Sequence, residues 1–222
     1  MQNIMGDFKK KVVIIDYNLG NLFSVKQACD TVGMNAIISS DKKEIEEADA
    51  LILPGVGAFI EAMTNLENLK LVEPIKNAVG NGKPLFGICL GLQLLFTKSE
   101  EFGSGEGLNL IDGVIRKFPA IYNERKIKVP QIAWNKIYSS KQHWGNSPLS
   151  EIEENEFMYF VHSYYVDPTE ESCVMTLSNY EGLEYCSGIS KNNIFATQFH
   201  PEKSAEKGIS IYRNWAIINN LL

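Results

Sequence analysis

The chain of 222 residues has little cysteine and little histidine, with four and three residues respectively. The cysteines stand at positions 29, 89, 173 and 186, so the sequence contains no C-x-x-C pair and no spacing typical of zinc ligands. This usage is typical of a protein kept in a reducing compartment, and we expect a cytoplasmic chain without a metal. We expect Cys29, Cys173 and Cys186 to pack in the interior.

Several other signals are also missing. No apolar run approaches the length of about 20 residues that crosses a bilayer, and the first residues lack the apolar core of a signal peptide. The net charge is −6 and the only basic run is a short one at residues 9–11, so we expect neither membrane nor nucleic-acid binding. The phosphate-binding pattern G-x-x-x-x-G-K-[ST] is absent, which excludes a P-loop, and no cofactor is expected.

The most informative segment that is present runs Gly87-Ile88-Cys89-Leu90-Gly91, between an apolar strand-like run and a helical pattern over residues 92–96. It has the form G-x-nucleophile-x-G, in which glycines make room for a sharp strand-to-helix turn. Such a turn exposes the sulfur at a helix N-terminus, which favours the reactive thiolate. Cys89 is therefore a predicted nucleophile. The alternative is a buried cysteine between packing glycines.

A base for this nucleophile is offered by His200 and Glu202, which follow a strand-like run at residues 193–197. A cysteine nucleophile needs a base, and the base needs an orienting carboxylate. In an extended segment residues i and i+2 lie on the same side, and Pro201 favours an extended His200. An isolated His-x-Glu pair is more often a surface pair, so the prediction depends on its combination with the Cys89 segment.

A third segment, Leu51 to Phe59, reads as a buried strand that ends in a Pro-Gly-Val-Gly loop before a helix. Attack on an amide passes through an oxyanion, which needs backbone N–H donors. Glycines allow the close approach and the unusual dihedral angles that such donors require. We expect the donors among Gly55, Val56, Gly57 and Leu90; the alternative is an ordinary strand-to-helix turn.

Strand and helix patterns alternate along the first half of the chain. Strands are predicted at 12–16, 35–39, 50–53 and 84–88, and helices at 22–33, 42–48 and 58–79, the last interrupted near Pro74. This order predicts an α/β fold with a doubly wound, mostly parallel central sheet of the flavodoxin-like type. Between 103 and 197, short aromatic and β-branched runs predict a smaller mixed or antiparallel sheet. A final helix over 205–222 is expected to bury one stripe, which comprises Gly208, Ile211, Tyr212, Trp215, Ile218 and Leu222. We expect one domain over residues 11–222, after a flexible leader over 1–10.

The cysteine, histidine and glycine segments, in this order, resemble those of the class I (triad) glutamine amidotransferases. The resemblance becomes closer with Asp-Tyr-Asn-Leu-Gly-Asn-Leu at residues 16–22, Val-Pro-Gln-Ile-Ala-Trp-Asn at 129–135 and Tyr-Phe-Val-His-Ser-Tyr-Tyr at 159–165. These are similar to segments of the glutaminase subunits of imidazole glycerol phosphate synthase, and the match covers almost the whole chain. It implies that L-glutamine is hydrolysed to glutamate and ammonia through a cysteinyl thioester. It also implies a heterodimer with a (β/α)8-barrel synthase subunit, which uses the ammonia to form imidazole glycerol phosphate and AICAR in histidine biosynthesis.

The resemblance assigns roles by position. It makes Cys89 the nucleophile, His200 the general base and acid, and Glu202 the orienting acid. It implies an oxyanion region at Gly55, Val56, Gly57 and Leu90, and glutamine-binding roles for Gly57, Gln93, Glu101, Ser163 and Tyr164. It places Trp134, Asn135, Tyr159 and Lys203 at the partner interface. Without it, Gln93 would be taken for an exposed helix residue and Glu101 for a solvated charge. His162 is expected to be structural and His143 a loop residue.

Two segments depart from the family pattern. Gln131-Ile132-Ala133 stands where the family has His-Met-Gly, and residues 184–188 are also unusual. Both could shape the partner-facing or ammonia-exit side. They leave open a paralogous branch that makes acetamidino sugars for surface polysaccharide. Two further alternatives are a cysteine hydrolase or peptidase on the same scaffold and a non-catalytic interaction subunit. Glu202 and the Pro-Gly-Val-Gly loop argue against the first, and the intact triad against the second.

Overall fold

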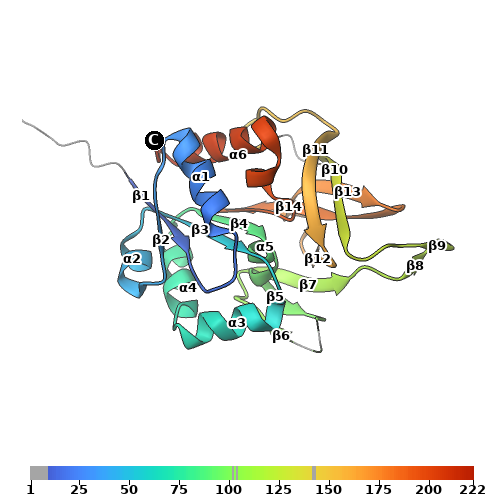
Figure 1. The fold of residues 1–222 in the computed structure, drawn as a ribbon, viewed down its shortest axis with the longest axis horizontal. Coiled ribbons are helices and arrows are strands. Elements are labelled where there is room, and N and C mark those ends of the chain that lie inside the picture. Colours follow the sequence, from blue (N-terminus) through green and yellow to red (C-terminus); the bar gives the residue numbers. More distant parts are fainter. Residues whose placement is uncertain (1–9, 102, 104, 142–143) are drawn as a thin grey trace, which may run out of the picture.

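A computed structural model describes residues 10–101, 103, 105–141 and 144–222. A long mixed sheet forms its middle layer, and helices cover both faces of the parallel half of that sheet (Figure 1). Residues 1–9 of the leader expected over 1–10, and the expected loop residue His143, lie outside the described residues. The predicted α/β class with a mostly parallel central sheet is confirmed.

The parallel half contains the strands β1 (Lys11–Ile15), β2 (Asn35–Ser39), β3 (Ala50–Gly55), β4 (Leu85–Cys89) and β15 (Ile194–Thr197). They lie in the order β2-β1-β3-β4-β15, and every neighbouring pair is parallel. All residues of β3 and β4 are buried, because helices cover both of their faces. The four strands predicted in the first half are present within two residues of the expected ends. The carboxyl ends of β3, β4 and β15 meet at one edge of the sheet.

Two helical layers enclose this half (Figure 1). The helices α1 (Leu22–Val32) and α6 (Ala205–Ile218) pack over one face, in a core that includes Ile14, Cys29 and Trp215. The helices α2 (Lys42–Glu47), α3 (Phe59–Asn68), α4 (Val72–Gly80) and α5 (Leu90–Leu94) pack over the other. α1 ends at Gly33, whose φ of 88° closes the helix in the left-handed conformation.

Three helix predictions need correction. The segment 58–79 is two helices, α3 and α4, and the break falls at residues 69–71; Pro74 lies in the first turn of α4, where its missing N–H costs no hydrogen bond. The helix after Cys89 ends at Leu94, because the chain turns into β5 (Phe96–Ser99). The last helix ends at Ile218. Ile218 and Leu222 are about half exposed (46% and 56%), so they do not belong to the core as expected.

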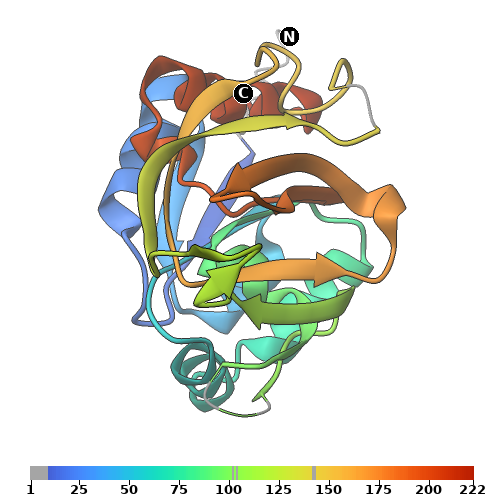
Figure 2. The ribbon, with the colours of Figure 1, turned by 90° about the vertical axis from the view of Figure 1, so that its right-hand side faces the viewer.

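The other half of the sheet lies beyond β15, and its strand pairs are antiparallel except for β5, which runs parallel to the strand Ile111–Lys117. β14 (Leu183–Lys191) pairs with β15, and β12 (Tyr164–Pro168), β7 (Ile111–Lys117), β5 and β6 (Gly105–Glu106) continue from it. β13 (Val174–Tyr180) joins β14 to β10 (Gln131–Ser139), which pairs with β11 (Glu156–His162). Figure 2 looks onto this half. The remaining elements are the hairpin β8 (Ile121–Tyr122) and β9 (Arg125–Lys126), and two 3-10 turns, Glu171–Cys173 and Pro201–Lys203.

Candidate active site

The predicted sharp turn is present at the end of β4. Cys89 is its corner, with φ 55° and ψ −106°, a strained conformation for a residue with a side chain. Gly91 is required for this turn, since a Cβ there would lie 1.7 Å from the carbonyl oxygen of Leu53 on β3. The turn is therefore held against the neighbouring strand, and it fixes where the sulfur points.

His200 and Glu202 form a buried pair beyond the end of β15. His200 Nδ1 lies 2.8 Å from Glu202 Oε1, and the side chains are 2% and 1% exposed. The pair forms through the 3-10 turn Pro201–Lys203, and not along an extended segment as predicted. The backbone N–H of His200 donates to the carbonyl of Tyr159 on β11 (2.9 Å), which fixes the ring beside the adjacent strand.

The electrostatics of this pair involve Cys89. Burial alone lowers the pKa of His200, but the Cys89 sulfur and the Glu202 carboxylate oppose it and raise the pKa to about 10. Nε2 of His200 has no hydrogen-bond partner among the described atoms, so this nitrogen is available on the side away from Glu202. Hydrogen bonds between catalytic groups are often long in a ligand-free site. A raised pKa at the imidazole is what a thiolate–imidazolium pair requires.

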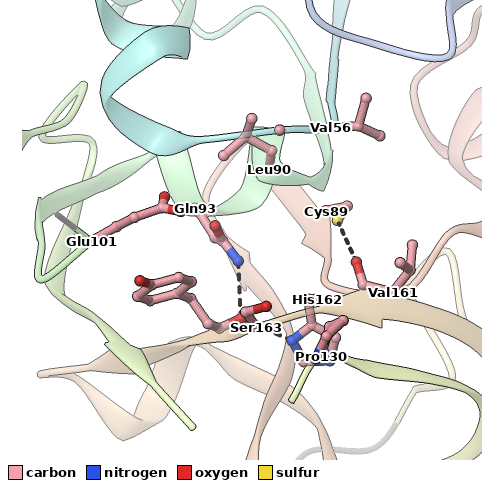
Figure 3. A pocket seen from close by; sticks show the side chains of 11 residues that line it. Val56, Cys89, Leu90, Gln93, Glu101, Pro130, Val161, His162 and Ser163 are labelled. Carbon is pink, nitrogen blue, oxygen red and sulfur yellow. Dashed lines mark hydrogen bonds between the residues drawn. The ribbon is translucent and has the colours of Figure 1, made fainter.

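Cys89 opens into a cavity of about 330 Å³, which is within the range of small-molecule sites. The predicted residues that line it are Val56, Gly57, Cys89, Leu90, Gln93, Glu101, Ser163 and Tyr164 (Figure 3). Pro130, Val161 and His162 also line it and were not predicted. Gly55, His200 and Glu202 do not line it. Gly55 pairs in register with Cys89 on the adjacent strand, and the side chains of His200 and Glu202 are buried.

The Pro-Gly-Val-Gly loop rests on a residue that sequence reasoning missed. The hydroxyl of Tyr17 donates to the carbonyl of Pro54 (2.7 Å), and Tyr17 is fully buried. A Cβ on Gly55 would lie 2.1 Å from this hydroxyl, so glycine is required where the loop approaches Tyr17. Burial raises the pKa of Tyr17 far above its ordinary value, which keeps the hydroxyl a donor. The loop is thereby held beside the Cys89 turn.

Glu101 is buried, at 7% exposed, and is no solvated charge. Its Oε2 accepts a hydrogen bond of 2.7 Å from the backbone N–H of Phe59, the first residue of α3. Burial raises the pKa of Glu101, whereas this hydrogen bond and Lys117 act in the opposite direction. The wall of the cavity therefore carries one acidic group that a cationic ligand atom would stabilise.

His162, which the sequence predicts to be structural, lies on the cavity wall. Its Nδ1 is 2.8 Å from the carbonyl of Tyr164, and its Nε2 is 3.3 Å from the hydroxyl of Tyr185. Burial lowers the pKa of His162 to about 4, so the ring is neutral at pH 7. No carboxylate contacts it among its hydrogen bonds within the described residues.

The two segments that depart from the family pattern meet in the interior. The hydroxyl of Tyr185 donates to Oε1 of Gln131 (3.0 Å), and the two residues are 3% and 0% exposed. Gln131 pairs in register with His162. These two residues therefore lie behind the cavity wall, whereas Ile132 of the same segment is 61% exposed. That the two segments shape the partner-facing or ammonia-exit side stays a prediction.

Three of the four predicted interface residues lie together. Trp134 and Tyr159 are cross-strand neighbours whose rings lie 6.0 Å apart, and Lys203 Nζ lies 5.9 Å from the Tyr159 ring. Asn135 lies on the opposite face of β10, because side chains alternate along a strand, and its amide donates to the carbonyl of Asn179. We call the exposed face of Ile132, Trp134, Phe157, Tyr159 and Val161 the β10–β11 face. Its members Ile132, Trp134 and Phe157 are exposed by 48% or more.

Within the described ranges, no cluster of three or more His, Cys, Asp or Glu side chains is arranged to hold a metal ion. None of the helices in the described part of the chain has the length and apolarity to cross a membrane. All four cysteines are free and buried, which agrees with the expected packing of Cys29, Cys173 and Cys186.

Comparison with known proteins agrees with the fold. A family model described as glutamine amidotransferase class-I matches residues 13–218, so the chain belongs to this family. The solved structure of PurLQS from Thermotoga maritima superposes with a TM-score of 0.70 at 18% identity, covering 94% of this chain and 98% of that one. A solved structure described as a glutamine amidotransferase gives a TM-score of 0.71 at 16% identity, covering 94% and 98%. These two likenesses concern the fold alone.

Curated relatives are more specific. The imidazole glycerol phosphate synthase subunit HisH of Geobacter metallireducens is 45% identical over 208 residues, which cover 93% of this chain and 97% of the relative. The subunit of the same name from Aquifex aeolicus is 45% identical over 206 residues, covering 92% and 95%. The resemblance found in the sequence is thereby confirmed.

Proposed function

We propose that this chain is the glutaminase subunit of an imidazole glycerol phosphate synthase in histidine biosynthesis. It hydrolyses L-glutamine and delivers ammonia to a (β/α)8-barrel synthase subunit. The observation that carries the proposal is the strained Cys89 at the wall of a cavity of about 330 Å³, with the buried His200–Glu202 pair acting on it electrostatically. The 45% identity to HisH subunits supports the choice of pathway. The chain works in the cytoplasm, where its cysteines stay reduced.

The cavity suits an extended glutamine. In Figure 3, Gln93 lies between Glu101 and Cys89, so the acidic group and the sulfur are separated along the cavity. Glu101 binds the substrate ammonium, and the backbone of Ser163 and Tyr164 binds the carboxylate. The side-chain amide of the substrate then reaches Cys89. Placing the charged end at Glu101 aligns the amide carbon with the sulfur, which lowers the entropic part of the barrier.

The reaction proceeds in two steps. The Cys89 sulfur attacks the amide carbon, and the backbone N–H groups of Val56 and Leu90 stabilise the oxyanion. His200, aligned by Glu202, protonates the amide nitrogen, and the C–N bond breaks to release ammonia and leave a thioester. His200 then accepts a proton from water, which attacks the thioester. The C–S bond breaks, glutamate leaves and the Cys89 sulfur is restored.

The partner binds at the β10–β11 face. Tyr159 connects this face with the catalytic pair. Its ring contacts Trp134 on one side, and its ring centroid lies 6.4 Å from that of His200 on the other. The backbone N–H of Tyr159 donates to Ser204 Oγ, and the same hydroxyl donates to the carbonyl of His200 (3.0 and 2.7 Å). A barrel subunit docked here closes the cavity side from which ammonia leaves, and its contacts reach His200 through Tyr159.

The test is glutamate release from glutamine by this chain mixed with the histidine-pathway barrel subunit of its own cell, with and without that subunit's nucleotide ligand. We expect strong stimulation by the liganded partner. Cys89→Ala should lower turnover by about 10³-fold or more. Cys173→Ala, which alters another buried cysteine outside the site, should keep turnover near that of the unmodified chain.

Other outcomes would overturn the proposal at different levels. If only a sugar amidotransferase stimulates turnover, the pathway is wrong and the acetamidino-sugar branch is right, while the glutaminase chemistry stands. Hydrolysis of peptides or esters without glutamate release would favour a cysteine hydrolase. Turnover that is unchanged in Cys89→Ala, or absent with every partner, would favour a non-catalytic subunit.

A further inference from the structure

Gln198 is a fully buried residue that contacts the sulfur of Cys89 and was not among the predicted site residues. It directly follows β15, and its backbone N–H donates to the carbonyl of Ser187 (2.9 Å), which fixes its position on the neighbouring strand β14. Its side-chain Nε2 lies 3.6 Å from Cys89 Sγ, and its Oε1 accepts a hydrogen bond of 3.1 Å from Gln93 Nε2. The nitrogen and the oxygen of the Gln198 amide therefore each contact a residue of the site.

A backbone carbonyl fixes the direction of these hydrogen bonds. The oxygen of Tyr164 only accepts, so the atom of Gln93 that lies 3.0 Å from it is the amide nitrogen. The second hydrogen of that nitrogen goes to Gln198 Oε1. This leaves Gln198 Nε2 as the atom that faces the sulfur. Turning the Gln198 amide over would place its nitrogen against the Gln93 nitrogen and its oxygen against the sulfur, which is unfavourable at both ends.

The arrangement has two chemical consequences. An N–H donor aimed at the sulfur stabilises the thiolate more than the thiol, because a hydrogen bond to a charged acceptor is the stronger one. Gln93 is held by two bonds through its nitrogen, so its Oε1 is the atom left to accept a hydrogen bond from a ligand in the cavity. Gln198 thus connects the orientation of a cavity wall residue with the state of the nucleophile.

We propose that Gln198 is a positioning residue of the glutaminase, which donates to the Cys89 thiolate and holds Gln93 in its substrate-binding orientation. This inference rests on the proposed function for its meaning in turnover. The contacts of Gln198 with the Cys89 sulfur and with Gln93 form without substrate, so their effect on Cys89 can be measured in the absence of glutamine.

The other ionisable groups around Cys89 come from several elements and stay in place when Gln198 is changed. His200 and Glu202 approach from the turn after β15, Tyr17 from the loop after β1, and His162 from β11. Glu101 lies on the cavity wall. A shift in the reactivity of Cys89 between variants at Gln198 therefore reports the amide itself.

The experiment measures the rate at which iodoacetamide alkylates Cys89 in the full chain as a function of pH, with the labelled cysteine located by mass spectrometry. Gln198→Met keeps the length of the side chain and removes both the donor and the acceptor. We expect the midpoint of its rate–pH curve to move up by about one pH unit. Gln198→Glu keeps an acceptor for Gln93 but places a carboxylate at the sulfur, so its midpoint should also move up.

The same variants distinguish the two proposed roles of Gln198, donation to the Cys89 sulfur and the orientation of Gln93, when glutamine turnover is measured with the partner present. We expect Gln198→Met to raise KM and lower kcat, because Gln93 is released and the thiolate is less favoured. Gln198→Glu should lower kcat with a smaller change in KM, because Gln93 keeps its acceptor. Asn214→Leu is the matched control. It removes a buried amide that bonds to Pro148 and Ser150 and should leave the rate–pH curve in place.

An unchanged midpoint in both folded Gln198 variants would overturn the inference, as would an equal shift in Asn214→Leu. If Gln198→Met fails to fold, Gln198→Glu and the smaller change Gln198→Asn still decide it, since the first removes the N–H donor and the second moves it away from the sulfur. Failure of the proposed function gives a different result. In that case the unmodified chain releases no glutamate with any partner, while the alkylation curves still differ between Gln198 variants.

Discussion

At the scale of single residues, the site depends on groups whose ionisation is set by burial and by one or two neighbours. His200 and His162 show this with opposite signs. Cys89 and Glu202 raise the pKa of His200 to about 10 against the effect of burial, whereas burial lowers the pKa of His162 to about 4. One ring therefore favours the protonated form and the other the neutral form at pH 7, which suits a catalytic and a structural histidine respectively.

This difference predicts a pH dependence of stability. His200 binds its proton more tightly in the folded chain than at its ordinary pKa of 6.5. Its stabilising contribution is therefore complete below about pH 6.5 and is lost as the pH rises toward about 10. Urea unfolding at pH 6.5 and 9.5 should show a larger loss of stability for the unmodified chain than for His200→Asn. Parallel losses would contradict the assignment. The pKa of His162 is lowered from 6.5 to about 4 in the folded chain. Its protonation therefore destabilises the fold, and this effect sets in only as the pH falls below about 6.5.

Glu101 gives a second residue-scale prediction. Glu101→Gln keeps an oxygen for the Phe59 N–H but removes the charge that we propose binds the substrate ammonium. We expect KM for glutamine to rise at least about tenfold, with a smaller change in kcat. The neighbouring Glu100→Gln is the control, because Glu100 is 53% exposed in its side chain and pairs with Arg116 at the surface. A similar KM for the two variants would argue against this role of Glu101.

At the scale of elements, the site is the edge where β3, β4 and β15 end together. Gly55 and Cys89 are register partners on β3 and β4, so the Pro-Gly-Val-Gly loop begins beside the nucleophile. β15 pairs with β4 on the other side and leads into His200. Backbone hydrogen bonds between parallel strands therefore fix the spacing of the Pro-Gly-Val-Gly loop, Cys89 and His200, the proposed oxyanion loop, nucleophile and base, before any side chain contributes.

The packing of the Cys89 turn against β3 can be tested at Gly91. Gly91→Ala places a Cβ 1.7 Å from the Leu53 carbonyl oxygen, which the chain can relieve only by separating the turn from β3. We expect a loss of more than about 3 kcal/mol in the free energy of unfolding, or no folded protein. Gly80→Ala at the end of α4 is the matched control, since no atom lies within 4 Å of its Cβ. Comparable melting temperatures in the two variants would contradict the requirement for glycine at Gly91.

At the scale of the whole molecule, Cys89 belongs to the helix-covered parallel half, and residues 161–164 of the other half line the same cavity. That other half also carries β10 and β11, which lie side by side in Figure 2. Val161 belongs to both the cavity wall and the β10–β11 face. Its carbonyl lies 3.8 Å from Cys89 Sγ, and its side chain is on the β10–β11 face. A partner on this face is therefore one strand away from the nucleophile.

Because the β10–β11 face is exposed, we expect a mutation there to weaken partner binding without lowering the stability of the chain. Trp134 is 50% exposed, so Trp134→Ala should leave the melting temperature nearly unchanged. We expect it to weaken binding of the barrel subunit by about 10- to 100-fold and to reduce the stimulation of turnover. Calorimetric titration measures the affinity. Ile217→Ala on α6, at 55% exposed, is a control of similar exposure on another element. Equal affinities for the two variants would place the interface elsewhere.

The local signals in the sequence determined much of this protein. The G-x-Cys-x-G pattern, the buried strands and the two-residue spacing of His200 and Glu202 are short-range features, and each depends on backbone sterics or periodicity within a few residues. For this reason the parallel strands, the Cys89 turn and the histidine–carboxylate contact could be predicted. The helix ends were less predictable, because tertiary packing decided that α5 stops at Leu94 and that α3 and α4 separate before Pro74.

Only the tertiary structure decided which distant residues meet. Gln93 and Gln198 are 105 residues apart in sequence, and they touch because β15 inserts beside β4. Gln198 stands two residues before His200, which was a possible signal for it, but the sequence gives no distance between Gln198 and Cys89. In the same way, strand pairing buried Gln131 against Tyr185 and turned Asn135 away from Trp134. Long-range contacts follow from strand order and register, which are properties of the assembled sheet.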